Sequence, residues 1–234
     1  MIRSLLLVVM ARTSPPKPTL VFLVRHGRTP TTGKVLPGRA KGLHLGEVGI
    51  AQAEAVANQL STWHDLQRDA NKKASGITAV YASPMERTRE TAAPIAKKLG
   101  LRVRRNKGLI EADFGDWTGK KLRDLYKKRE WATVQQYPSG FRFPGGESFG
   151  EMQIRMVDAI QTLVATHAGE AIVAVSHADT IKAATAHALG THLDLFQRIV
   201  VAPCSVTAIQ YSSLGPRVLG LNTMGDPDNI GGIA

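Results

Sequence analysis

Cysteine and aromatic residues are scarce in this chain. Among 234 residues there is one cysteine, Cys204, and 6% are aromatic. A single cysteine excludes an intrachain disulfide framework and a cysteine-rich metal site, and it weakly favours a reducing compartment. Cys204 follows Pro203 in an apolar run, without the arginine-containing loop of a cysteine-dependent phosphatase. We therefore expect a small core side chain and predict a cytoplasmic protein.

Long hydrophobic runs are also missing. The apolar run at residues 5–10 is far shorter than the roughly 20 residues that span a bilayer, so no membrane association is expected. The same run is short for a secretion signal, which leaves export as a minor alternative. Translation could begin at Met1 or at Met10. We assign residues 1–17 to a disordered or processed leader and residues 18–234 to a single domain, a simpler interpretation than two small domains.

Acidic residues are outnumbered, with 19 Asp and Glu against 30 Lys and Arg and a net charge of +11. Most of the excess lies between Lys97 and Arg129, a segment whose role the sequence leaves open. No nucleic-acid-binding motif or set of interleaved aromatic residues accompanies it, so nucleic acid is not an expected partner. A positive field of this kind also attracts small anions, and a phosphorylated small molecule is the expected partner.

Hydrophobic periodicity predicts alternating strands and helices. The strands are expected at 19–24, 78–82, 101–105, 171–175, 205–211 and 217–221, and the helices at 47–61, 84–99, 120–136, 148–167 and 178–189. Ser83 and Ser148 are the expected N-caps of two of these helices. The β-α-β order predicts an α/β fold, in which a mostly parallel twisted sheet carries helices on both faces and makes three layers.

Polar residues follow two of the apolar strands directly. Arg25 and His26 come after the first strand, and Ser176 and His177 come after the strand at 171–175. Ligands of open α/β sheets bind beyond the carboxyl ends of the strands, so these side chains are candidates for one pocket. Arg87, near the start of a helix, could join them or lie on the helix surface. Arginine binds phosphate oxygens in a bidentate manner, so the pocket suits a phosphoryl group.

Six blocks of residues, in order from Thr19 to near Thr223, resemble the histidine phosphatase superfamily, which is also called phosphoglycerate-mutase-like. The blocks are Arg25-His26-Gly27, Leu45 to Ala53, Ala82 to Ala92, Glu111 to Gly119, Pro144 to Ser148, and Ser176-His177. The resemblance is to the shorter, phosphatase-type members, some of which are described as phosphomutases. It implies the phosphoglycerate-mutase-like α/β fold, with no cofactor and no metal ion.

The resemblance also implies a role for each matching residue. His26 matches the nucleophile that becomes a phosphohistidine, and Glu111 matches the general acid and base, with Asp113 and Asp116 as nearby rivals. The residues that hold the phosphoryl oxygens are matched by Arg25, Arg87 and His177, and we expect His177 to act as a charged donor.

This chain departs from the family pattern close to the pocket. Thr32 stands where many members carry an asparagine, Arg28 stands where Glu or Gln is common, and Asp179 lies one residue beyond the usual His-Gly. Arg28, Thr32 and Arg39 are the candidate substrate-binding residues.

The separation of Glu111 and His177, 66 positions, resembles that of the phosphatase-type members. We therefore predict a phosphomonoesterase that releases inorganic phosphate from a small phosphorylated metabolite. A phosphomutase of the same family is the alternative, because the segment Leu193 to Arg198 resembles members described as phosphomutases. A non-catalytic protein that binds a partner through its basic face is a third hypothesis. The oligomeric state cannot be read from the sequence, and a homodimer is left open.

Overall fold

The computed structural model describes residues 16–70 and 76–224, which form a layered α/β structure around one sheet. The predicted leader lies outside these residues except for Pro16 and Lys17. The sheet has six strands in the order β3-β2-β4-β1-β5-β6. Their bounds are Thr19–Arg25 (β1), Ile77–Ala82 (β2), Val103–Arg105 (β3), Ala171–Ser176 (β4), Val206–Ser212 (β5) and Gly215–Thr223 (β6). Strands β3, β2, β4 and β1 are parallel, and β5 and β6 are antiparallel.

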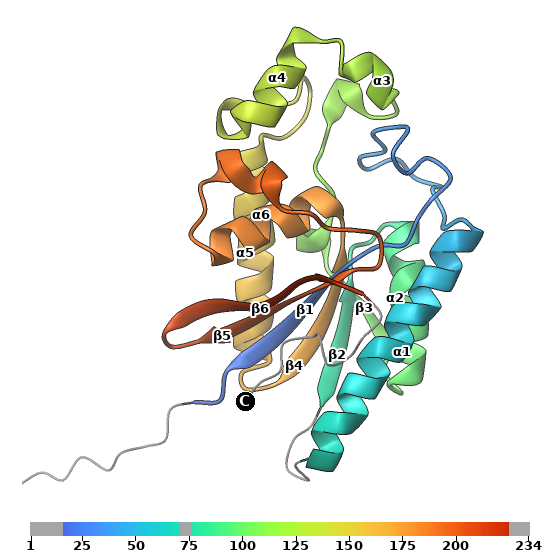
Figure 1. The fold of residues 1–234 in the computed structure, drawn as a ribbon, viewed down its shortest axis with the longest axis vertical. Helices are drawn as coiled ribbons and strands as arrows, with labels where there is room; N and C mark the ends of the chain where they lie inside the picture. Colours follow the sequence, from blue (N-terminus) through green and yellow to red (C-terminus); the bar gives the residue numbers. More distant parts are fainter. Residues whose placement is uncertain (1–15, 71–75, 225–234) are drawn as a thin grey trace, which may run out of the picture.

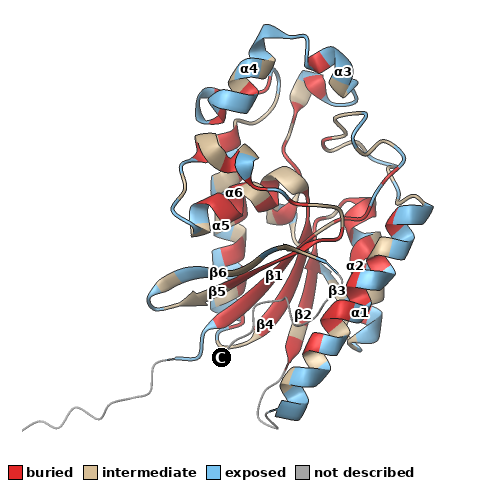
Figure 2. Ribbon diagram, in the orientation of Figure 1, coloured by how far each residue is buried: buried red, intermediate tan, exposed pale blue. Residues whose placement is uncertain are grey.

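Helices cover both faces of the sheet, which confirms the predicted fold class (Figure 1). On one face lie α1 (Glu47–Ala70) and α2 (Glu86–Lys98), and on the other lie α5 (Phe149–Thr166) and α6 (Ala178–Ala188). The side chains of β1 alternate between the two cores, with Phe22 facing α1 and α2 while Leu23 faces α5 and α6. Figure 2 shows the buried residues concentrated on the sheet and on the inner faces of these helices.

Helix α1 is longer than the sequence predicts, since it continues past residue 61 to Ala70. The ring of Trp63 packs edge-on against that of Phe22, with the centroids 4.7 Å apart. At the next residue, Nδ1 of His64 accepts a hydrogen bond from the backbone N–H of Ile77 at 3.0 Å. These two tertiary contacts stabilise a part of the helix in which apolar residues no longer recur at helical spacing.

The predicted helix over 120–136 is wrong, because the chain forms two short helices there, α3 (Leu122–Leu125) and α4 (Arg129–Gln136). Leu125 and Val134 are both buried in the same core. They are nine residues apart, or two and a half helical turns, so one straight helix would place them on opposite sides. Breaking the helix between them allows both side chains to be buried. The segment 115–146, which carries α3 and α4, is called the cap below.

Three other local expectations are settled by the structure. The strand expected at 101–105 is shorter, Val103–Arg105, and α2 begins at Glu86 with Met85 as its N-cap, so the prediction of Ser83 as N-cap is wrong. Ser83 instead faces His177.

Cys204 is buried, as expected, and burial raises the pKa of its thiol to about 12. Within residues 16–70 and 76–224, no helix has the length and apolarity needed to cross a membrane.

Ser148 caps α5, as predicted. Its Oγ accepts the backbone N–H of Glu151 at 3.1 Å, and Oε2 of Glu151 accepts the backbone N–H of Ser148 at 2.9 Å. We expect Ser148→Ala to lower the free energy of unfolding by about 1 kcal/mol, because the backbone N–H of Glu151 loses its hydrogen-bond acceptor. Thermal unfolding followed by circular dichroism measures this, with the exposed turn variant Ser213→Ala as control. Equal melting temperatures for the two variants would contradict the prediction.

Candidate active site

Two histidines meet at the carboxyl edge of the sheet because β1 and β4 are parallel neighbours in register. Arg25 pairs with Ser176, so the next residue of each strand is a histidine. The backbone N–H of His26 donates to the carbonyl oxygen of Ser176 at 3.0 Å. The two imidazole rings lie with their centroids 5.3 Å apart, and both side chains are buried. The structure thus brings together the two strand-end histidines of the sequence.

The His26 imidazole is neutral and fixed in orientation. Its Nδ1 lies 2.7 Å from the carbonyl oxygen of Gly27, so Nδ1 carries the proton and Nε2 keeps a lone pair. Burial, followed by the nearby guanidinium of Arg87, lowers the pKa of His26 to about 3. Gly27 allows the close approach of the α1 backbone, because a Cβ there would lie 2.5 Å from the carbonyl oxygen of Gly49. An unprotonated, oriented nitrogen is what nucleophilic attack requires.

Two arginines place unpaired donors beside His26. Arg87 is completely buried, and its Nη2 donates to the carbonyl oxygen of Gly38 at 2.8 Å. Within the described part of the chain, Nε and Nη1 of Arg87 and Nε of Arg25 are buried without a hydrogen-bond partner. Nη1 of Arg25 donates to the carbonyl oxygen of Val201 at 2.7 Å. Buried charged donors without acceptors are costly, so this arrangement suits an anion with several oxygens.

His177 lies at the N-terminus of α6, between a hydroxyl and a guanidinium. Its Nε2 is 2.9 Å from Oγ of Ser83, and its Nδ1 is 3.2 Å from Nη2 of Arg87. Because the guanidinium can only donate, Nδ1 accepts and Nε2 carries the proton. Burial and then Arg87 lower the pKa of His177 well below its ordinary value. The expected charged donor is therefore a neutral donor here, and a phosphoryl dianion beside it would favour its protonation.

Glu111 supplies a buried carboxyl group to the same site, from the loop that follows β3. Its Oε2 lies 3.8 Å from Nδ1 of His177, and its Oε1 accepts the backbone N–H of Ala112 at 2.9 Å. Burial is the main cause that raises the pKa of Glu111 to about 7, and the negative charge of Asp179 adds to it. A carboxyl group with this pKa exists in both protonation states near neutral pH, so it can donate and accept a proton.

The backbone of Glu111 is held by two arginines that share one carboxylate. Arg39 Nε donates to the Glu111 carbonyl oxygen at 2.9 Å, and Arg155 Nη2 approaches the same oxygen at 3.4 Å. Oε1 of Glu147 lies 3.0 Å from Nη2 of Arg39 and 2.7 Å from Nη2 of Arg155. Arg39 is a candidate substrate-binding residue from the sequence, whereas the structure places its guanidinium in this clamp. The pairing of Arg155 with Glu147 has no local sequence signal, so the sequence did not predict a role for either residue.

The remaining carboxylates and loop residues have other contacts. Asp113 pairs with Arg39 at 3.2 Å, and Asp116 is exposed, so Glu111 is the buried member of the three acidic residues considered. Oγ1 of Thr32 accepts the backbone N–H of Thr29 at 2.9 Å and thereby fastens the loop after β1. Arg28 is exposed at the start of that loop. Within the described residues, the side chains of Arg28 and Thr32 donate no hydrogen bond to His26 or Glu111.

Groups that could hold a metal ion are not found near this site. Within residues 16–70 and 76–224, no three His, Cys, Asp or Glu side chains are clustered suitably for metal binding. The two guanidinium groups beside the histidines would also repel a cation. The donor set favours an anionic ligand instead.

The order of the motifs and this geometry agree with a match to a protein-family model. The model for the "Histidine phosphatase superfamily (branch 1)" matches residues 21–224. The chain belongs to the histidine phosphatase superfamily. This histidine phosphatase is 30% identical over 194 residues to "Probable phosphoglycerate mutase GpmB" of Yersinia pestis, covering 82% of this chain and 84% of the relative. The resemblance inferred from the sequence is therefore confirmed.

Two further comparisons concern phosphatases. The chain is 28% identical over 210 residues to "Phosphoserine phosphatase 1" of Hydrogenobacter thermophilus, covering 86% of this chain and 91% of the relative. The solved structure of a phosphoserine phosphatase mutant from Entamoeba histolytica, in complex with phosphoserine, matches with a TM-score of 0.74 and 24% identity. That match covers 88% of this chain and 97% of the other, and it shows that the two proteins share a fold.

Proposed function

We propose that this histidine phosphatase is a metal-independent phosphomonoesterase that releases inorganic phosphate from a small phosphorylated metabolite. One observation carries the proposal. A neutral His26 with a free Nε2 lies beside Arg87, a buried guanidinium with two unpartnered nitrogens. A nucleophile beside unpaired cationic donors suits transfer of a phosphoryl group, whose charge spreads over three equatorial oxygens.

In the first step, Arg25, Arg87 and His177 hold the phosphoryl oxygens while Nε2 of His26 attacks phosphorus. The N–P bond forms as the ester P–O bond breaks in line. Glu111 is the source of the proton that the departing alkoxide takes up, and its pKa of about 7 keeps this proton available near neutral pH. The alcohol leaves, and His26 carries the phosphoryl group.

In the second step, the Glu111 carboxylate takes a proton from water. The water oxygen attacks phosphorus, the N–P bond breaks, and its electron pair returns to Nε2 of His26. Inorganic phosphate leaves, and Glu111 is again protonated. The clamp formed by Arg39, Arg155 and Glu147 supports this double role, because it fixes the backbone from which the carboxyl group projects.

A phosphomutase is the second candidate, supported by the relative that is described as a phosphoglycerate mutase. Incubation with p-nitrophenyl phosphate and a panel of sugar phosphates and phosphoglycerates, with and without a chelator, tests the choice. We expect release of inorganic phosphate at a rate that the chelator leaves unchanged. Transfer of phosphate to a second position of the same molecule, seen by ³¹P NMR, would establish the mutase instead. Loss of activity in chelator would contradict the metal-independent mechanism.

A further inference from the structure

A second pocket, which we call the rim pocket, lies between the loop after β1 and the start of the cap. It encloses about 470 Å³. Its lining residues are Gly33, Lys34, Val35, Lys121, Leu122, Arg123 and Tyr126. None of them belongs to the set proposed above for phosphoryl transfer, so the pocket is an addition to the catalytic centre.

Backbone pairing makes the walls of the rim pocket rigid. Val35 and Lys121 form an antiparallel bridge. On either side of it, the N–H of Leu122 donates to the carbonyl oxygen of Lys34, and the N–H of Leu36 donates to that of Lys120, both at 2.9 Å. A two-stranded ribbon therefore joins the loop after β1 to the cap. The pocket is preformed, so a ligand would not have to order these segments.

The lining of the rim pocket combines positive charge with apolar surface. Three of its seven residues are cations, Lys34, Lys121 and Arg123, and none is acidic. In the described ranges, the ammonium groups of Lys34 and Lys121 form no ion pair and no side-chain hydrogen bond. Nε of Arg123 lies 3.6 Å from Oδ1 of Asp124. Tyr126 is 57% exposed, and its ring packs edge-on against that of Trp131. An anionic group on a flat or apolar carbon skeleton is the complementary ligand.

The same loop connects the rim pocket to the catalytic centre. Gly38, whose carbonyl oxygen accepts a hydrogen bond from Arg87, lies four residues after Lys34. An extended chain rises about 3.3 Å per residue, so the Cα atoms of the two residues are at most roughly 13 Å apart. The loop therefore links the rim pocket to the hydrogen-bond partner of Arg87, the buried guanidinium that is proposed to hold the transferred phosphate.

We propose that the rim pocket binds a second anionic group of the substrate whose phosphate is transferred to His26. The preferred substrate is then a metabolite with two anionic ends, in which a linker separates a carboxylate or a second phosphate from the scissile phosphate. This inference rests on the proposed phosphomonoesterase function. Binding measurements that require no turnover separate the two claims.

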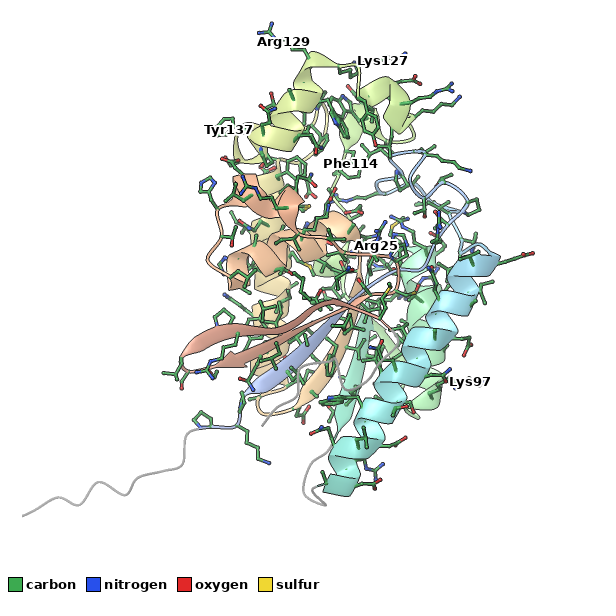
Figure 3. The ribbon with its side chains drawn as sticks, viewed as in Figure 1. Arg25, Lys97, Phe114, Lys127, Arg129 and Tyr137 are labelled. Atoms are coloured by element: carbon green, nitrogen blue, oxygen red, sulfur yellow. The ribbon has the colours of Figure 1, made fainter. Side chains whose placement is uncertain are left out.

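The test compares two double variants. Lys34→Gln with Lys121→Gln removes two lysine charges from the pocket, whereas Lys97→Gln with Lys98→Gln removes two lysine charges from the last turn of α2. Lys97 lies well away from both Arg25 and the cap (Figure 3). All four side chains are exposed, so we expect both variants to fold. Matched net charge means that a general field effect would change both variants equally.

The probes are phosphorylated oligo(ethylene glycol) chains of graded length that end in an alcohol, a carboxylate or a second phosphate. For binding, calorimetry uses the corresponding phosphonates, which are not hydrolysed. Above a threshold length, we expect the wild type to bind anion-ended chains about tenfold more tightly than alcohol-ended ones. The Lys34 and Lys121 double variant should lose this preference. The control variant should keep both this preference and the wild-type rate of p-nitrophenyl phosphate hydrolysis.

Equal affinity of the wild type for alcohol-ended and anion-ended chains at every length would overturn the rim-pocket proposal, whatever the catalytic activity. An equal loss in the two double variants would also overturn it, because the effect would then come from the general positive field. If the wild type prefers anion-ended chains but hydrolyses no phosphate ester, the proposed phosphomonoesterase function is contradicted and the rim-pocket proposal stands. Whether the carboxylate or the phosphate arm binds more tightly identifies the terminal group.

Discussion

Substitution of His26 by alanine is expected to lower kcat/KM for phosphate esters by about 10⁴-fold or more, because no other group replaces a covalent nucleophile. The same substitution should abolish a covalent phosphoenzyme. Rapid quenching of the wild type with a ³²P-labelled ester should give labelled protein that is labile in acid and stable in alkali, as expected for a phosphoramidate. His26→Ala should give none.

The control for this experiment is His187→Ala, which removes an exposed imidazole at the end of α6. We expect normal rates and normal labelling in this variant. Because the guanidinium groups of Arg25 and Arg87 remain in His26→Ala, inorganic phosphate should still protect that variant from thermal unfolding. Full activity of His26→Ala would eliminate the nucleophile assignment, and label that persists in it would move the covalent site to another residue.

Glu111→Gln is expected to give the second largest effect, and the effect should depend on the leaving group. For alkyl phosphates, whose alkoxide needs a proton, we expect a loss of about 10²–10⁴-fold. For p-nitrophenyl phosphate, the first step should persist because p-nitrophenolate leaves without a proton. The second step still needs a base, so stopped-flow absorbance should show a burst of p-nitrophenolate, stoichiometric with enzyme, followed by slow turnover.

The pH dependence of kcat/KM tests the same assignment. The first step determines whether kcat/KM rises or falls with pH. Glu111 must be protonated to donate, and its pKa of about 7 predicts that kcat/KM for an alkyl phosphate falls as the pH rises through 7. His26, with a pKa of about 3, stays neutral across this range. Dividing the wild-type profile by that of Glu111→Gln removes the titration of the substrate itself.

The exposed rival Asp116→Asn is the matched control and should keep the wild-type profile. A descending limb near pH 7 that survives in Glu111→Gln would show that another group is the acid.

The raised pKa also predicts that Glu111 favours folding at low pH and that this contribution is lost as the pH rises from about 4.5 to 7. Glu111→Gln should therefore be more stable than the wild type above pH 7, and equilibrium unfolding measures the difference.

The strands and the two strand-end histidines could be predicted because their signals are local. An apolar run that ends in Arg25 and His26, and another that ends in His177, already place those residues on one edge of a parallel sheet. The local sequence also predicts Ser148 as a helix N-cap, which the structure confirms. The predicted helix over 120–136 is wrong because no local pattern says that Leu125 and Val134 must both face the same core.

The α/β architecture, the position of His26 and His177 at the carboxyl edge of the sheet, and the superfamily follow from local patterns and from motifs in order along the chain. The folded structure, by contrast, shows that Arg87 is a buried donor and not a helix-surface residue, and that Glu111 lies beside His177. It also showed Arg39 held against Glu147 and brought two basic segments together as the rim pocket. The difference arises because periodicity and capping are encoded over a few residues, whereas burial, pKa values and ion pairing depend on groups that are distant in sequence.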